Sequence, residues 1–111
     1  MGRKALCRIV LLLLSAISLF GQASASLNGR VTDPRRDPVA GAAVTVTNTA
    51  SGVARDTVTN GEGLYNVPSL GPGNYNIKVT AQGFSTAERK SVELLTGSNL
   101  NVDVQMSLGT V

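Results

Sequence analysis

Strict alternation of apolar and polar residues near the C-terminal end constrains the fold more than any other feature of this sequence. Between residues 100 and 108 every second residue is apolar: Leu100, Val102, Val104, Met106 and Leu108. Successive side chains of a β-strand point to opposite faces. The pattern therefore predicts a strand that packs one face on a core and leaves the other in water.

The same period recurs at 27–32, 44–47 and 75–81, and shorter candidate strands cover 53–59, 64–67 and 90–94. Turn-forming residues separate these segments at 33–34, 60–61, 71–73 and 96–97. No segment after residue 26 has a sustained helical period. About seven short strands can bury their apolar faces only if two sheets pack together. We therefore expect an all-β fold, an antiparallel sandwich of about seven strands.

The N-terminal segment has the organisation of a signal peptide. Arg3, Lys4 and Arg8 precede an apolar run at 9–20. That run is shorter than the roughly 20 residues that a membrane-spanning helix needs. A secretory signal peptide therefore explains it better than a transmembrane anchor, and better than the alternative of an uncleaved N-terminal helix.

Small residues at Ala23 and Ala25 give the A-x-A pattern that signal peptidase recognises. We expect cleavage after Ala25, which makes residues 1–25 the signal peptide and 26–111 one exported domain. The mature chain is then expected to have no transmembrane span.

Removal of the signal peptide changes the charge balance, because it takes three of the ten basic residues and leaves seven, against seven acidic residues. The basic pairs 35–36 and 89–90 each have an acidic neighbour, Asp37 or Glu88. Nucleic-acid affinity comes mainly from clustered, unopposed basic residues. We therefore expect no nucleic-acid partner.

Several classes of catalysis are excluded by residue type. The sequence has no His, and its one cysteine, Cys7, lies in the segment predicted to be removed. The usual zinc ligand sets and a Cys or Ser nucleophile with a His base cannot be assembled. The acidic residues Asp33, Asp37, Asp56 and Glu62 leave an acid–base pair or a calcium site open, although acidic residues in turns usually bind backbone amides. We expect no enzyme activity and no cofactor.

Spaced motifs carry a family resemblance. They are LNGRVTD at 27–33, PVAGAAVTV at 38–46, TNGEGLYNV at 59–67, LGPGNYNIKV at 70–79 and AQGF at 81–84. In this order they resemble the carboxypeptidase regulatory-like domains, which are similar to transthyretin (prealbumin) in fold and are grouped with starch-binding sandwiches. One departure is that Arg36 and Asp37 stand before Pro38, where the family commonly has glycine.

The resemblance implies a non-catalytic domain of the kind found at the N-terminus of TonB-dependent outer-membrane receptors. Residues 101–111 are similar to the segment that leads from such a domain to the receptor plug. The implied partner is a receptor plug and barrel or another envelope protein, and the chain is then a piece of such a receptor. The implied location is the periplasm or outer membrane of a Gram-negative bacterium, or otherwise outside the cell.

Two other functions stay open. One is polysaccharide binding, for which the candidate residues are the aromatics Tyr65, Tyr75 and Phe84. Sugar rings stack on exposed aromatic side chains, whereas the alternation assigns these three to the core. The other is a structural or interaction module that adds a partner's strand to the edge of a sheet.

Overall fold

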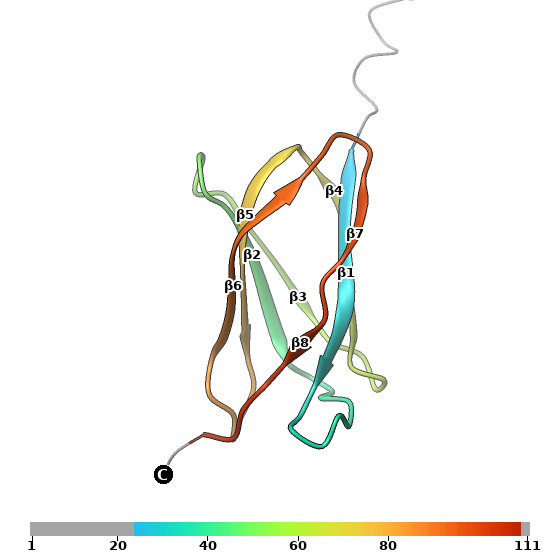
Figure 1. The fold of residues 1–111 in the computed structure, drawn as a ribbon, viewed down its shortest axis with the longest axis vertical. Coiled ribbons are helices and arrows are strands. Elements are labelled where there is room, and N and C mark those ends of the chain that lie inside the picture. The colour runs from blue at the N-terminus through green and yellow to red at the C-terminus, as the bar shows by residue number, and fades with distance from the viewer. Residues whose placement is uncertain (1–23, 110–111) are drawn as a thin grey trace, which may run out of the picture.

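The structure is a computed structural model, and it describes residues 24–109. These residues form a sandwich of two sheets (Figure 1). The strands are β1 (Ala25–Thr32), β2 (Ala43–Asn48), β3 (Ala54–Val58), β4 (Leu64–Leu70), β5 (Gly73–Thr80), β6 (Ala87–Leu94), β7 (Asn99–Asn101) and β8 (Val104–Gln105). One sheet has the order β3-β2-β5-β6, and the other has the order β4-β1-β7, with β8 pairing farther along β1. The predicted all-β sandwich is confirmed.

The core lies between the two sheets and follows the alternation in the sequence. In β1 the buried positions Leu27, Gly29 and Val31 alternate with residues that reach the surface. Val44 of β2 pairs with Val79 of β5, and both side chains are completely buried. The largest fully buried side chains are Leu27, Ile77, Leu94, Met106, Val31, Val44, Val46 and Val79. The two inner faces therefore supply one continuous apolar core.

The C-terminal segment differs from its prediction as one strand. It forms two short strands, β7 and β8, and both pair with β1 in parallel, whereas the other strand pairs are antiparallel. The interruption falls at Val102 and Asp103, where the Val102 carbonyl turns inward over Gly29. Leu108, expected on the core face, is 68% exposed, because the chain has left the sheet by that point.

The predicted signal peptide lies almost wholly outside the described residues, and Ala23 is among those not described. The proposed cleavage site after Ala25 falls inside β1, since Ala25 is buried and pairs with Leu70. The division at residue 25 stays a prediction. Within residues 24–109 no helix is long and apolar enough to cross a membrane.

The sandwich has two open sides, where an edge strand of one sheet faces an edge strand of the other. On the β3–β4 side, β3 lies beside β4. On the β6–β8 side, β6 faces the C-terminal strands that run along β1 (Figure 1). The candidate site residues divide between these two sides.

Candidate functional site

Tyr65 closes the core on the β6–β8 side. It lies in β4 opposite Gly29 of β1, and only 4% of its surface is exposed. Its hydroxyl donates a hydrogen bond of 2.5 Å to the Val102 carbonyl. Burial raises the pKa of Tyr65 to about 12; the nearby Asp103 carboxylate also raises it, while Arg89 lowers it. The neutral phenol is thus a fixed donor at physiological pH.

Gly29 makes this closure sterically feasible. A Cβ built on Gly29 would lie 1.9 Å from the Val102 carbonyl oxygen and 2.9 Å from the Tyr65 hydroxyl. Neither separation is compatible with a side chain. The Gly29 position therefore lets the C-terminal segment approach β1 closely.

Tyr75 has the corresponding place on the other side. It lies in β5, is 5% exposed, and donates a hydrogen bond of 2.8 Å to the Gly71 carbonyl. Phe84 is half-buried against the core, next to Leu108. Tyr65 and Tyr75 line different recesses, and neither recess includes Phe84. The structure does not bring the three aromatic candidates into one binding platform.

Arg55 bridges the two sheets on the β3–β4 side. It pairs with the buried Val46, so its side chain leaves the inner face of the edge strand β3. Its guanidinium donates hydrogen bonds of 3.1 Å to the Pro68 carbonyl and 3.4 Å to the Ser69 carbonyl, both on β4. Arg55 therefore links β3 to β4 across this side of the sandwich.

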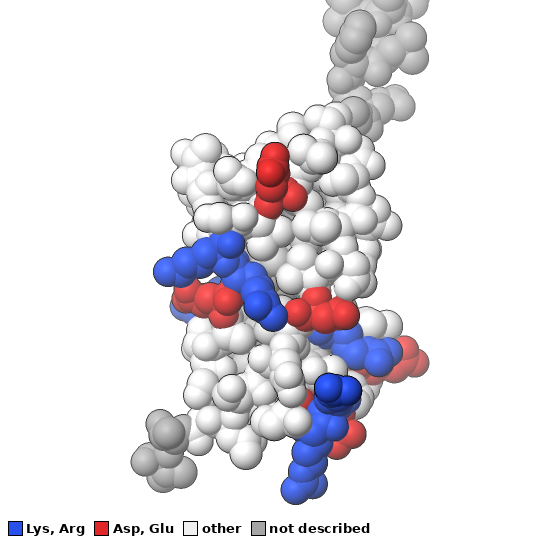
Figure 2. Space-filling model, in the orientation of Figure 1, with Lys and Arg blue, Asp and Glu red and all other residues white. Residues whose placement is uncertain are grey.

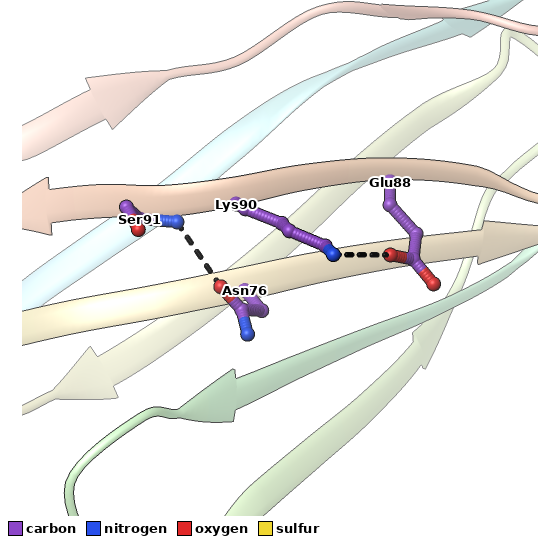
Figure 3. A network of polar contacts seen from close by, with 4 residues as sticks. All are labelled: Asn76, Glu88, Lys90 and Ser91. Atoms are coloured by element: carbon purple, nitrogen blue, oxygen red, sulfur yellow. Dashed lines mark hydrogen bonds and ion pairs between the residues drawn. The ribbon is translucent and has the colours of Figure 1, made fainter.

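The β6–β8 side also has an arginine, Arg89, on the inner face of its edge strand, opposite the buried Ile77. A β-bulge brings it there: the register shifts between Tyr75 and Ile77, and Ser91 has a positive φ of 56°. Figure 3 shows the Ser91 amide bonded at 3.0 Å to the Asn76 side-chain oxygen. Such bulges redirect side chains at sheet edges.

Glu88 and Lys90, on either side of Arg89, lie on the outer face of β6 and form an ion pair of 4.0 Å (Figure 3). Arg89 instead contributes to an open recess of about 400 Å³. Its lining residues are Arg30, Thr32, Arg36, Arg89, Asp103, Val104 and Gln105. The basic pair at 89–90 is thus divided between the two faces of the strand. The sequence pattern did not predict this recess.

A second open recess, of about 550 Å³, adjoins the first and shares Arg30 and Asp103 with it. Asparagines dominate it, with Asn66, Asn28 and Asn101 in register across β4, β1 and β7. The Asn101 amide donates to the Asn28 side-chain oxygen at 3.1 Å. These amides offer donors and acceptors to a polar ligand, although the Asn28 and Asn101 side chains also bond each other.

Of the four acidic candidates, Asp33 and Asp56 form hydrogen bonds within the fold, whereas Asp37 and Glu62 are exposed. The Asp33 carboxylate accepts the amides of Arg35 and Asp37, each at 2.9 Å, which organises the turn that departs from the family pattern. Asp56 accepts the Thr45 hydroxyl. Among residues 24–109 no three acidic, histidine or cysteine side chains are grouped as metal ligands.

Comparison with known proteins matches residues 26–107 to the carboxypeptidase regulatory-like domain. A curated relative is the TonB-dependent transporter Oar of Myxococcus xanthus, 27% identical over 94 residues. The match covers 85% of this chain but 9% of the transporter. The chain therefore spans a small fraction of the length of this relative.

Solved structures share the fold at low identity. The Bacillus anthracis TIE protein has a TM-score of 0.63 at 18% identity, over 78% of this chain and 17% of that one. A putative carbohydrate binding protein from Bacteroides uniformis has a TM-score of 0.62 at 18% identity, over 76% and 41%. A cohesin–X-dockerin complex from Acetivibrio cellulolyticus has 0.61 at 19%, over 77% and 58%. With the family match across the two sheets, the chain belongs to the carboxypeptidase regulatory-like domain family.

Proposed function

We propose that this chain is a non-catalytic, exported accessory domain of a TonB-dependent outer-membrane receptor, where it binds or spaces a partner in the periplasm. The observation that carries the proposal is the match to the TonB-dependent transporter Oar, which covers most of this chain and a small part of that protein. A self-contained module within a larger receptor explains why the match covers most of this chain and only a small part of the transporter. The absence of histidine from the sequence supports a non-catalytic role.

The reading frame downstream of Val111 in the source genome provides the direct test. A plug and barrel encoded in that frame would support the accessory-domain function, and a stop codon with no receptor would contradict it. In the intact receptor, deletion of 26–107 should leave the barrel inserted in the outer membrane and alter binding of the partner. Unchanged binding of the partner would exclude a binding role for the domain, and its role would then be that of a spacer.

Export is tested separately by N-terminal sequencing of the chain recovered from the periplasm. Cleavage after Ala25 gives a protein that begins at Ser26. A protein that begins at Ser24 would still be exported but would keep the buried Ala25 in β1. An intact N-terminus would contradict the signal peptide.

Strand addition at β3 is a second candidate function, favoured by one observation. β3 is an edge strand that pairs with β2 without a bulge, and the exposed apolar side chains Val53 and Val58 lie at its ends. The other edge of this sheet, β6, has a bulge and charged residues that oppose pairing. A partner strand would therefore add to β3.

Val58→Lys should weaken capture of such a partner by the receptor, while Leu95→Lys, at an equally exposed position outside β3, should not. Equal effects of the two substitutions would exclude β3 as the docking edge.

Polysaccharide binding has less support, because the rings of Tyr65 and Tyr75 are buried. A glycan array tests it: binding that Tyr65→Ala abolishes without unfolding would overturn the assignment of Tyr65 to a purely structural role.

A further inference from the structure

Three arginines from separate parts of the chain line the recess on the β6–β8 side: Arg30, Arg36 and Arg89. We call this space the arginine recess. Arg30 comes from the C-terminal part of β1, Arg36 from the turn after β1, and Arg89 from the edge strand β6. In Figure 2, basic and acidic side chains are interspersed over the middle and lower part of this face of the molecule.

Specific backbone features place each of these arginines. The Arg30 amide donates to the Asp103 carboxylate at 2.9 Å, at the point where the pairing of β1 passes from β7 to β8. Arg36 has a positive φ of 68° in a turn organised by Asp33. The β6 bulge directs Arg89 inward. Positive φ at a non-glycine residue is unfavourable, and such strain is often found at ligand-binding positions.

The recess has more positive charge than its own acidic group can balance. Its one carboxylate is Asp103, and one oxygen of that group already accepts the Arg30 backbone amide. Within residues 24–109, no hydrogen bond or ion pair is formed by the guanidinium groups of Arg30, Arg36 or Arg89. Arg55, on the opposite side, has two backbone acceptors.

We propose that the arginine recess binds an oxyanion, the carboxylate or phosphate group of a ligand. The planar guanidinium fork matches both groups and forms short, charge-assisted hydrogen bonds with them. The recess volume of about 400 Å³ is sufficient for such a group with part of the ligand that bears it. This inference concerns the sandwich itself and does not depend on the receptor to which the domain belongs.

Two pairs of matched variants test the proposal. Arg36→Gln and Arg89→Gln each remove one charge from the recess. Arg35→Gln and Lys90→Gln remove the same charge from the neighbouring residue, which does not line the recess. The probes are inorganic phosphate and acetate, added separately to the purified chain at constant ionic strength. Amide chemical shifts in two-dimensional NMR report the position and saturation of binding.

The expected result is saturable binding of at least one probe, with shifts at residues that line the recess. Each recess variant should weaken binding about tenfold, the cost of one charge-assisted hydrogen bond, and each control should leave it nearly unchanged. The probe that binds identifies the ligand group as phosphate or carboxylate. Shifts that never saturate, or equal weakening by the controls, would overturn the proposal. Thermal unfolding of all four variants verifies that the fold is intact.

Discussion

The two open sides of the sandwich are built from the same kinds of residue but completed differently. Each has an arginine on the inner face of an edge strand and a buried tyrosine whose hydroxyl bonds a backbone carbonyl: Arg55 and Tyr75 on the β3–β4 side, Arg89 and Tyr65 on the β6–β8 side. Arg55 joins the sheets through the carbonyls of β4. On the other side the Val102 carbonyl and Tyr65 make the closure, and Arg89 lines a recess.

This difference distinguishes two roles for arginine, a structural role on one side and a ligand-binding role on the other. A guanidinium that already donates to backbone carbonyls contributes to stability, whereas one without such acceptors remains available to a ligand. The β3–β4 side should therefore lose stability when its arginine is replaced. The β6–β8 side should lose stability when Gly29 or Tyr65 is replaced, and it should lose binding when Arg89 is replaced.

Gly29→Ala should have the largest effect on stability. The added methyl group would lie 1.9 Å from the Val102 carbonyl oxygen, so the C-terminal segment must move away from β1. We expect a loss of about 3 kcal/mol or more in the free energy of unfolding, measured by urea denaturation. Gly61→Ala is the control, because no atom lies within 4 Å of its added methyl. Equal stability of the two variants would show that the backbone approach at Gly29 does not hold this side together.

High pH should weaken the β6–β8 side through Tyr65. The pKa of Tyr65 is raised from 10.0 to about 12, so the folded state holds the phenol proton more tightly than the unfolded state does. This contribution is complete below pH 10 and is lost as pH rises through about 12, a decrease of up to about 2 kcal/mol. Denaturation at pH 9 to 12 measures it. The decrease should be absent in Tyr65→Phe, and its persistence there would assign it to another group.

At neutral pH Tyr65→Phe should lower the free energy of unfolding by about 1 kcal/mol, because it removes the hydrogen bond to the Val102 carbonyl and leaves that carbonyl without this donor. Tyr75→Phe removes the equivalent bond on the β3–β4 side, to a carbonyl only four residues away in sequence. We expect a smaller loss there, because the bond is local and does not join distant segments. A larger loss for Tyr75→Phe, in the same urea titration, would contradict the role given to the Tyr65 closure.

Strand periodicity predicted the sandwich and most of its core, because buried positions in β1, β2 and β5 follow strict alternation. It could not predict the arginine recess, for a specific reason. Counting back from the inward-facing Val92 by twos would place Lys90 inward and Arg89 outward. The bulge at Ser91 reverses this assignment. Local backbone irregularity, which has no period, thus determines which charge faces the recess.

The division of 100–108 into β7 and β8 was equally hidden from the sequence. The apolar alternation continues through Val102, and the Val102 amide still donates to the Asn28 carbonyl of β1. The ladder is interrupted because the Val102 carbonyl turns over Gly29 toward the Tyr65 hydroxyl. The contact joins residues far apart in sequence. Alternation within one segment contains no information about such a contact, so the position of Asp103 beside Arg30 also required the structure.

Arg55→Gln tests the β3–β4 side, where Arg55 joins the two sheets. Loss of the guanidinium removes hydrogen bonds to the Pro68 and Ser69 carbonyls, and we expect a decrease of about 0.5 to 1 kcal/mol, because both bonds are exposed to solvent. Amide hydrogen exchange in β3 and β4 should accelerate, which would locate the change. Unaltered exchange in both strands would show that Arg55 does not couple the two sheets.

Arg89→Gln should have the smallest effect on stability, within about 0.5 kcal/mol, since within the described part of the chain its guanidinium has no hydrogen-bond acceptor to lose. Removing its charge also removes the favourable influence on ionised Tyr65, so the pKa of Tyr65 should rise slightly further. Urea titrations of Arg89→Gln and Arg55→Gln under the same conditions compare the two sides directly. If replacing Arg89 lowers the free energy of unfolding as much as replacing Arg55 does, both arginines hold the sheets together. The distinction between a structural arginine on the β3–β4 side and a ligand-binding arginine on the β6–β8 side would then fail.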